Sequence, residues 1–399
     1  MKPALELWHE ACFYLKFYYF GHSTLRLAPK IRRMTATLIQ DLRGKRGEFK
    51  DAHRYIEELR GAIADSHTLF HNADEYSKLV RIYSGKIQYD SGFGLDFLTS
   101  NDSGTEILIN EVLADSPAAM LGIQPFDRVV RVNKKRLSSK ENLNWYLSQV
   151  SFVELLIARG SVNNPIEFQV SLQKTRLPDL KLPYVYRYSP PSQTTPIFVL
   201  RIPSFRGNKS IAPRVHQLVR QIQEIGAKSL ILDLRGNDGG AVSECYGAAS
   251  AFVLEAKNLS QTRLQSYTVG YDGWRCMTND PRDQKNYDIP EPAFWQGKTV
   301  VLVNLVTSSC GEVMANLLQR HQILVLGETT DGRLNTTAEF WQLSDGSALQ
   351  ITNARTLDLT KKPLPEFVTP NEKMADDQAK TVNTGNDALL ERAYHLLKM

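Results

Sequence analysis

The stretch Thr307-Ser308-Ser309-Cys310-Gly311-Glu312 lies between two segments of different periodicity, and the fold follows from their contrast. Residues 299–304 (TVVLVN) before it are apolar and β-branched, which predicts a buried strand. Residues 313–321 after it carry apolar side chains at helical spacing. A strand that runs directly into a helix is typical of a parallel βαβ layer. The turn between them opens at the carboxyl end of the strand, where open α/β sheets place their sites.

Ser309 has two interpretations at this turn. Serine is a favoured helix N-cap, and Glu312 three residues later completes the pattern of a capping box, so the stretch alone favours a cap. A hydroxyl at this place would also lie near unpaired backbone N–H groups and the positive end of the helix dipole. Both features favour an alkoxide or an oxyanion, so Ser309 is also a candidate nucleophile.

Length and composition narrow the classes of function. A chain of 399 residues predicts two or three domains. The net charge of +5 is mild, and no basic run beyond residues 30–33 suggests nucleic acid. The four cysteines lack C-x-x-C spacing, and nothing in the sequence implies a metal or a cofactor. No apolar stretch reaches the ~20 residues of a membrane span, and no secretory signal is visible. The chain as written is therefore expected in the cytoplasm, or in an extracytoplasmic compartment if an export signal has been removed.

Three regions follow from the patterning. Residues 1–83 have helical periodicity, with apolar stripes at Ala4, Leu7, Trp8, Ala11 and Leu15 and at Ile56, Leu59 and Ile63. Residues 84–175 change to short β-type runs, with one helix expected within 143–153. Residues 176–399 alternate strand and helix, which predicts an α/β core with mostly parallel strands. The prolines in 188–192 (YSPPS) predict a linker or boundary before the alternating pattern.

A second junction resembles the first. Residues 229–234 (SLILDL) predict a strand, and Gly239-Gly240 follow it just before the next helix. Glycines there let backbone N–H groups approach a ligand, as in an oxyanion hole, although a lone glycine pair is more often a tight turn. Because both junctions would lie at one edge of the same sheet, they strengthen each other as a site.

Several stretches together resemble the carboxyl-terminal processing (tail-specific) serine proteases. They are Asp65-Ser66-His67-Thr68, Ile202-Pro203-Ser204-Phe205, residues 232–240 (LDLRGNDGG), Ser308-Ser309-Cys310-Gly311-Glu312, residues 327–332 (GETTDG) and Val368-Thr369-Pro370-Asn371. The resemblance spans nearly the whole chain and implies a crotonase-like protease core, a mixed and mostly parallel sheet layered with helices. It also implies that Ser309 is the nucleophile and that polypeptides are the substrates.

Part of the middle region resembles a PDZ domain. The similarity lies in Gly92-Phe93-Gly94-Leu95, in Ser116-Pro117-Ala118-Ala119 and in residues 127–133. It implies an inserted β-rich domain in which Phe93, Gly94 and Leu95 bind the C-terminal carboxylate of a peptide that adds to a sheet edge. The alternative is a closed groove, with the domain acting only as a spacer or lid.

One departure from the family concerns the general base. Many members activate the serine with a lysine, but the corresponding place here holds Arg333. Guanidinium stays protonated in proteins, so Arg333 cannot accept the serine proton. A base from Lys361 or Lys362 has no support from spacing.

His67 is the best substitute, because imidazole titrates near pH ~6.5. The tricorn core protease and a nisin-degrading branch are similar in sheet architecture and use a Ser/His pair, and the adjacent Ser66 resembles the serine that orients histidine in tricorn. The alternative for His67 is a capping or packing residue. The resemblance also assigns oxyanion donation to the Cys310 amide with Gly240 or Gly239, and a looser match places a carboxylate at Glu366.

The sequence therefore predicts a serine endopeptidase that cleaves unfolded or tail-exposed proteins, with PDZ recognition of free C-termini. The competing hypothesis is a catalytically inactive relative that binds peptides as an adaptor or scaffold, and the missing lysine motivates it. This hypothesis requires His67 to lie beyond hydrogen-bond reach of Ser309, roughly 3.2 Å or one bridging water.

Overall fold

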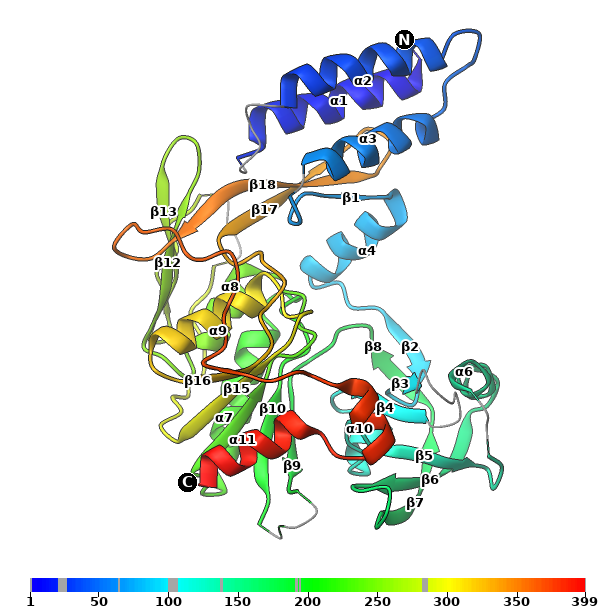
Figure 1. Ribbon diagram of the computed structural model, residues 1–399, viewed down its shortest axis with the longest axis vertical. Coiled ribbons are helices and arrows are strands. Elements are labelled where there is room, and N and C mark those ends of the chain that lie inside the picture. Colours follow the sequence, from blue (N-terminus) through cyan, green and yellow to red (C-terminus); the bar gives the residue numbers. More distant parts are fainter. Residues whose placement is uncertain are drawn as a thin grey trace.

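The computed structural model describes residues 2–20, 27–63, 65–99, 107–136, 139–190, 193, 195–281 and 286–398. It consists of an N-terminal helical region, a middle β-rich region and a core in which sheets and helices are layered (Figure 1). The expectation of a mixed α/β fold is confirmed. None of the helices in the described ranges combines the length and apolar character that crossing a bilayer requires.

The core is built on a six-stranded main sheet of order β19-β16-β15-β11-β10-β9. Its strands are β9 (Tyr184–Tyr188), β10 (Ile197–Arg201), β11 (Ser229–Asp233), β15 (Lys298–Val303), β16 (Leu324–Gly327) and β19 (Glu372–Lys373). All neighbours are parallel except β9 and β10. The near-continuous apolar runs of β10, β11, β15 and β16 are explained by burial of both sheet faces.

Helices cover both faces of the main sheet. Three of them, α7 (Ile211–Glu224), α8 (Val242–Ala249) and α9 (Cys310–Arg320), pack on one face in a single apolar cluster. The C-terminal α11 (Ala388–Lys398) packs on the other face, and α10 (Gln378–Thr384) precedes it. The two strand–helix junctions of interest, β11–α8 and β15–α9, are adjacent because β11 pairs with β15.

The proline break predicted at 188–192 is not a domain linker. β9 before it pairs antiparallel with β10 after it, so the prolines belong to the connection of a hairpin within the main sheet. Residues 191 and 192 lie outside the described residues. Proline ends a strand because it lacks the N–H that a ladder needs, and it does so equally well inside one sheet or between two domains.

A second, antiparallel sheet was not predicted. Its strands are β1 (Leu69–His71), β12 (Glu255–Gln261), β13 (Ser266–Asp272), β14 (Arg275–Cys276), β17 (Thr336–Gln342) and β18 (Ala348–Leu357). The order is β1-β18-β12-β13-β14, and β17 pairs with the opposite edge of β18. These strands are rich in polar residues because much of the sheet faces solvent or the cleft described below, so a search for apolar runs overlooks them.

Three N-terminal helices pack on this second sheet. They are α1 (Pro3–Tyr18), α2 (Leu27–Asp41) and α3 (Phe49–Ile63), and every residue of the two predicted apolar stripes is buried. Their cluster includes Leu349 and Ile351 of β18. After α3 the chain passes through β1 and α4 (Ala73–Tyr83) before it enters the middle region.

The middle region is a five-stranded antiparallel sheet of order β3-β4-β5-β6-β7. Its strands are β3 (Leu95–Thr99), β4 (Ile107–Val112), β5 (Arg128–Val132), β6 (Phe152–Arg159) and β7 (Ile166–Gln173), with α5 (Pro117–Met120) and α6 (Lys140–Gln149). The ribbon of β2 (Tyr89–Gly92) and β8 (Thr175–Pro178) joins it to the core. The helix expected within 143–153 ends at Gln149, because Val153, Leu155 and Ile157 alternate into the core as part of β6.

Candidate active site

The two glycine- and serine-bearing turns contact each other directly. Gly239 has φ +97°, and a Cβ added to it would lie 2.8 Å from Ser309 Cβ and 3.1 Å from Cys310 N. Only glycine lets the two loops approach this closely. The prediction that both junctions meet at one edge of the main sheet is confirmed.

Ser309 is held in a strained backbone conformation. Its φ of 51° and ψ of −117° lie in a region that residues with a Cβ rarely adopt. The Ser309 N–H donates to the Glu312 carboxylate at 2.8 Å, which is one half of the predicted capping box. The turn therefore presents the serine hydroxyl at the head of α9 while its own backbone is tied down.

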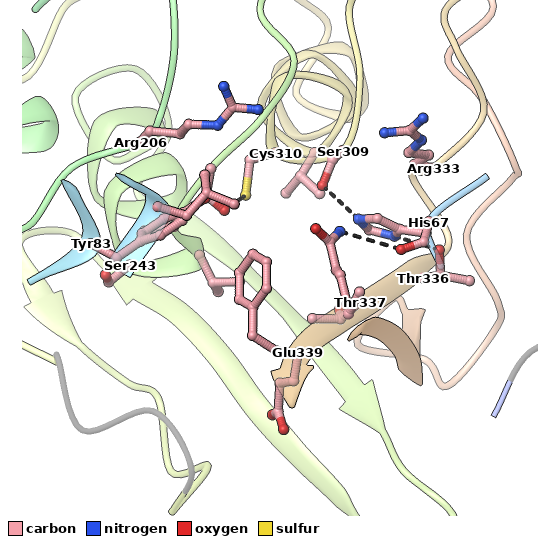
Figure 2. Close-up of a pocket in the computed structure, with 18 of the residues that line it drawn as sticks. His67, Tyr83, Arg206, Ser243, Ser309, Cys310, Arg333, Thr336, Thr337 and Glu339 are labelled. Atoms are coloured by element: carbon pink, nitrogen blue, oxygen red, sulfur yellow. Dashed lines mark hydrogen bonds between the residues drawn. The ribbon is translucent and has the colours of Figure 1, made fainter. Parts of the chain in front are cut away.

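The Ser309 hydroxyl is in contact with His67. The distance from Ser309 Oγ to His67 Nε2 is 3.2 Å, and the two residues are 242 positions apart in the chain (Figure 2). His67 is 6% exposed and lies in the loop between α3 and β1. Its N–H donates to Asp65 Oδ1 at 2.9 Å, and its carbonyl accepts from Gln350 Nε2 at 3.3 Å. Hydrogen bonds to both the N–H and the carbonyl of His67 therefore hold the loop in place.

The second ring nitrogen of His67 is paired with a hydroxyl from β17. Nδ1 lies 2.9 Å from Thr336 Oγ1. Ser66, which the resemblance to tricorn suggested for this role, is exposed, and no contact between it and the imidazole is seen among the described residues. That expectation is wrong because the side chain of Ser66 points to solvent while β17 passes beside the ring.

The surroundings of His67 favour its neutral form. Burial lowers the pKa of His67 to about 4, and the Arg333 guanidinium acts in the same direction. The carboxylates of Asp65 and Asp331 oppose this shift without cancelling it. A neutral imidazole at pH 7 has one nitrogen free to accept a proton.

Arg333 lies beside the pair but is engaged elsewhere. Its Nε is 3.0 Å from Asp331 Oδ2, and the same carboxylate oxygen accepts from Ser308 Oγ at 2.8 Å. Among the described residues that line the cleft there is no lysine. Lys361 and Lys362 lie in an exposed turn closed by Asp358, so neither is placed as a base.

Glu312 links the serine turn to the Arg333 loop. Its buried carboxylate accepts from Gly332 N–H at 2.9 Å, from Arg333 N–H at 2.8 Å and from the Thr330 hydroxyl, in addition to Ser309 N–H. Burial raises the pKa of Glu312 in spite of these donors. Glu312 is thus more than a helix cap, although it does not contact His67 in any bond seen here.

Gly240 and Cys310 belong to the two turns that meet at Ser309, and both residues line the cleft. No backbone partner is found for either N–H among the described residues, and Cys310 begins α9, where N–H groups are unpaired by geometry. Gly240 has φ +149°, and a Cβ there would lie 2.1 Å from the Phe205 carbonyl carbon. The Cys310 thiol, which could be proposed as a nucleophile, is buried and lies 3.4 Å from Gly240 O.

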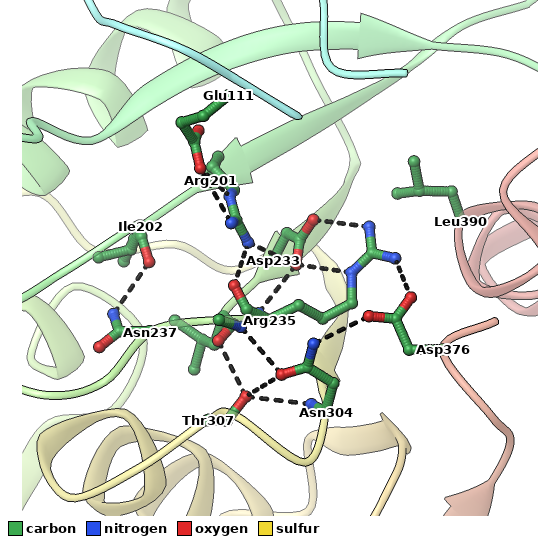
Figure 3. Close-up of polar contacts among 12 residues, drawn as sticks. Glu111, Arg201, Ile202, Asp233, Arg235, Asn237, Asn304, Thr307, Asp376 and Leu390 are labelled. Carbon is green, nitrogen blue, oxygen red and sulfur yellow. Dashed lines mark hydrogen bonds and ion pairs between the residues drawn. The ribbon is translucent and has the colours of Figure 1, made fainter. Parts of the chain in front are cut away.

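A buried ion network lies beneath the glycine turn (Figure 3). Glu111 of the middle region pairs with Arg201 of β10 at 3.0 Å, and Arg201 pairs with Asp233 at 3.2 Å. Arg235 pairs with Asp233 at 2.8 Å and with Asp376 at 3.0 Å. Burial alone would raise the pKa of Asp233, but the guanidinium groups of Arg235 and Arg201 outweigh it and lower that pKa to about 2.

This network connects to both turns through amide side chains. Asn304 donates to Asp376 at 2.9 Å and accepts from Gly236 N–H at 2.9 Å. Asn237 accepts from Gly239 N–H at 2.9 Å through its side chain, and its carbonyl accepts from Ser308 N–H at 2.8 Å. Hydrogen bonds from Asn237 and Asn304 therefore connect the backbone groups next to Ser309 to the buried ion network.

A cleft of about 540 Å³ opens in front of Ser309. Its walls come from the two helix N-termini, from β17, and from α4, whose Leu79, Val80 and Tyr83 face it. Glu366, the loosely matched carboxylate, is exposed and lies near Gly332, and among the described residues it forms no hydrogen bond with the imidazole. His216 is buried between backbone groups, with Nε2 2.9 Å from Gly247 O, and it does not line the cleft.

The residues expected to bind a carboxylate lie at the start of the edge strand of the middle sheet, and none of them lines the cleft. Phe93 is buried, Gly94 has φ +83°, and Leu95 begins the edge strand β3. α6 packs beside β3. The space between an edge strand and a helix is open in principle to an added strand.

Sequence reasoning did not identify Thr336, Asn237 or Asn304 as parts of the site. Thr336 gave no signal because one threonine in a polar stretch is unremarkable by composition. The two asparagines follow the carboxyl ends of β11 and β15, and that shared position is a signal that could have been used.

One model of a known protein family matches part of the chain. Residues 196–374 match the model for peptidase family S41. This S41 segment contains Ser309, Gly240, Cys310 and Arg333, whereas His67 and the middle region lie outside it.

Curated relatives extend the similarity beyond the S41 segment. The carboxy-terminal processing protease CtpA of Bacillus subtilis is 27% identical over 301 residues, which are 71% of this chain and 59% of that protein. The carboxyl-terminal-processing protease of Synechocystis is 28% identical over 313 residues, 77% of this chain and 66% of that protein. The chain thus spans less than two thirds of the length of these relatives.

Solved structures share the fold. A putative S41 protease from Bacteroides fragilis has a TM-score of 0.54 at 16% identity, covering 84% of this chain and 87% of that chain. Mature CPAF has a TM-score of 0.52 at 12% identity, covering 100% of this chain and 96% of that chain. At such identities the similarity is one of fold.

Proposed function

We propose that the protein is a serine endopeptidase that cleaves unfolded or C-terminal-tail-exposed polypeptides. The observation that carries the proposal is the 3.2 Å contact between Ser309 Oγ and His67 Nε2 on a strained strand-to-helix turn. The match of residues 196–374 to peptidase family S41 and the similarity to carboxyl-terminal processing proteases support it.

The roles of the residues follow from their geometry. In the tautomer that this mechanism requires, Nδ1–H of His67 donates to Thr336 Oγ1, which leaves the Nε2 lone pair to accept the proton of Ser309 as the hydroxyl attacks the scissile carbonyl. The oxyanion that forms is stabilised by the amides of Cys310 and Gly240. His67 then returns its proton to the leaving amine, and water, activated in the same way, releases the acyl group.

The proton transfer creates an imidazolium in a buried place. Asp65 and Asp331 stabilise that charge, since both raise the pKa of His67, while Arg333 keeps the resting ring neutral. Arg333 thus has an electrostatic role, and His67 takes the role that lysine has in many relatives.

The middle region recognises the free C-terminus of the substrate. Phe93, Gly94 and Leu95 offer backbone N–H groups to the carboxylate, and the peptide adds to the edge strand β3 beside α6. Binding of a labelled peptide with a free C-terminus to the Ser309→Ala protein, compared with its C-terminal amide, tests this role. Equal affinities for the two would refute it.

The adaptor hypothesis required an imidazole out of reach of the serine, and the observed contact counts against it. The deciding experiment is hydrolysis of casein by wild type, Ser309→Ala and His67→Ala at matched concentration. Activity lost in both folded variants supports the proposal. Activity that survives in His67→Ala refutes the assigned base, and an inactive wild type that still binds peptides favours the adaptor.

A further inference from the structure

The strand β17 has an unpaired edge that faces the cleft. β18 has β1 and β12 along one side and β17 along the other, and no further strand pairs with β17 among the described residues. Thr336, Thr337, Ala338, Glu339 and Phe340 of this strand all line the cleft. An exposed strand edge carries unpaired backbone donors and acceptors, which form a template for another strand.

The hairpin at the end of β17 shows which backbone groups point outward. Leu343 N–H donates to Ser347 O at 2.7 Å, so Leu343 and Ser347 are a hydrogen-bonded pair and the backbone groups of Leu343 point toward the side of β18. Opposite residues of an antiparallel ladder alternate between bonded and non-bonded pairs. Counting back by twos, Trp341 and Glu339 bond to β18, whereas Phe340 and Ala338 direct their N–H and C=O groups toward the cleft.

The residue opposite Ala338 confirms which backbone groups of β17 point away from β18. Thr352 lies opposite Ala338 across the ladder. Its N–H donates to Thr68 Oγ1 at 3.2 Å and its carbonyl accepts from Phe20 N–H at 2.7 Å, both on the β1 side of β18 and away from β17. Ala338 and Thr352 are therefore a non-bonded pair, and the backbone groups of Ala338 are available on the free edge.

The free edge leads to the reacting groups. β17 begins at Thr336, whose hydroxyl bonds the His67 ring, and Figure 2 shows Thr336, Thr337 and Glu339 along the strand as it runs away from that ring. At the far end Phe340 contacts Tyr76 and Tyr83 of α4, with ring centroids 5.9 and 6.1 Å apart. The edge thus runs along the cleft between the imidazole and α4.

We propose that an extended polypeptide binds as an added strand along the free edge of β17, paired with Ala338 and Phe340, and so delivers its scissile bond to Ser309. This inference rests on the proposed function and specifies how that site holds its substrate. Leu79 and Val80 of α4 also line the cleft, and these apolar side chains favour an unfolded segment with apolar side chains at alternate positions.

A backbone scan of a bound peptide tests the pairing. The probe is a fluorescein-labelled ten-residue segment of casein, bound to the full-length Ser309→Ala protein and followed by fluorescence anisotropy. Single N-methyl groups are placed along the peptide, since each removes one N–H donor and keeps the side chain. We expect affinity to fall roughly tenfold at alternate positions and to change little between them. Uniform losses, or no losses, would overturn the added strand.

A protein variant provides the complementary test. Ala338→Pro removes one outward N–H without removing a bond to β18, so the fold should persist, as thermal melting would verify. The Glu339→Pro protein is the matched control, because it loses a ladder bond and should melt earlier. Affinity of Ala338→Pro for the unmethylated peptide should fall about tenfold, and affinity within twofold of the parent would contradict the proposal.

The two proposals fail in different ways. A peptide that binds with the alternating pattern but is not cleaved by the wild-type protein leaves the added strand intact and refutes the protease. A peptide that is cleaved but shows no alternation refutes the added strand and leaves the protease. A peptide that does not bind refutes the added strand.

Discussion

The backbone of Ser309 makes a prediction about stability that does not depend on activity. Its φ of 51° and ψ of −117° are sterically costly for any residue with a Cβ. Ser309→Ala keeps the Cβ and therefore keeps the strain, whereas Ser309→Gly removes it. Both variants lose the hydroxyl and its contact with His67, so that contribution cancels in the comparison.

The expected difference in the free energy of unfolding is the sum of one favourable and two unfavourable contributions of the glycine. Relief of strain of this kind is worth about 1–3 kcal/mol. The added freedom of glycine in the unfolded chain costs about 0.5–1 kcal/mol. Loss of the Cβ that packs against Gly239 costs up to about 0.8 kcal/mol. Ser309→Gly should therefore be more stable than Ser309→Ala by about 1 kcal/mol.

Urea unfolding of the two variants, followed by tryptophan fluorescence with a common m-value, measures this difference. In a thermal melt it corresponds to about 2–4 °C for a cooperative unit of 150–250 residues. Thr307→Ala against Thr307→Gly is a suitable control, because no positive φ is found at that position and glycine should be the less stable of the pair. A Ser309→Gly protein that is less stable than Ser309→Ala would refute the argument that the turn stores strain.

Three further predictions concern the same region. Because the pKa of His67 is about 4, the rate of casein hydrolysis should decline only as the pH falls toward 4. Arg333→Gln should move this acidic decline to higher pH, since Arg333 lowers the pKa of His67. A decline centred near pH 6.5 in the wild type would contradict the effect of burial on His67. Between these pH values the unfolded chain binds the proton and the folded chain does not, so the stability contributed by this group is lost as pH falls from about 6.5 to 4. Thr336→Val should lower kcat roughly 10–100-fold with little change in KM, and Thr336→Ser should restore it; a KM effect alone would remove Thr336 from the positioning of the ring. Glu111→Ala leaves the buried Arg201 partly unpaired and should lower the free energy of unfolding, measured with urea, by about 3 kcal/mol. A surface ion pair contributes only ~0–1 kcal/mol, so a change below about 0.5 kcal/mol would show that this pair is solvated.

The local pattern of apolar residues was sufficient to predict the central strands of the main sheet and the two turns that follow them. Residues 300–303 (VVLV) and 230–232 (LIL) are apolar because both sheet faces are covered, and such runs are visible without knowledge of their partners. The position of Ser309 at the end of one run and of Gly239 at the end of the other then places the turns together, since the two strands are neighbours.

What could not be predicted depends on contacts between distant segments. β17 is half-buried along nearly its whole length, and β18 mixes polar and apolar residues although most of them are buried, so the pairing of these strands with each other and of β18 with β1 and β12 is not visible in the sequence. The choice of Thr336 over Ser66 as the partner of His67 is decided by which strand passes the ring, and no local pattern reports that. The prolines at 190 and 191 give the same signal in a hairpin as in a linker, which explains the misplaced boundary.

The separation of the reacting pair in the sequence has a consequence for how the protein comes to be active. His67 is placed by β1, and among the described strands β1 pairs only with β18, near the end of the chain. A ribosome has made the histidine loop long before Ser309, Thr336 and β18 emerge. Since the long loop must close before the imidazole reaches the hydroxyl, the pair forms late in folding. Under the proposed function, a chain that stops before β18 lacks the strand that places His67, and we expect it to be inactive even when it contains Ser309.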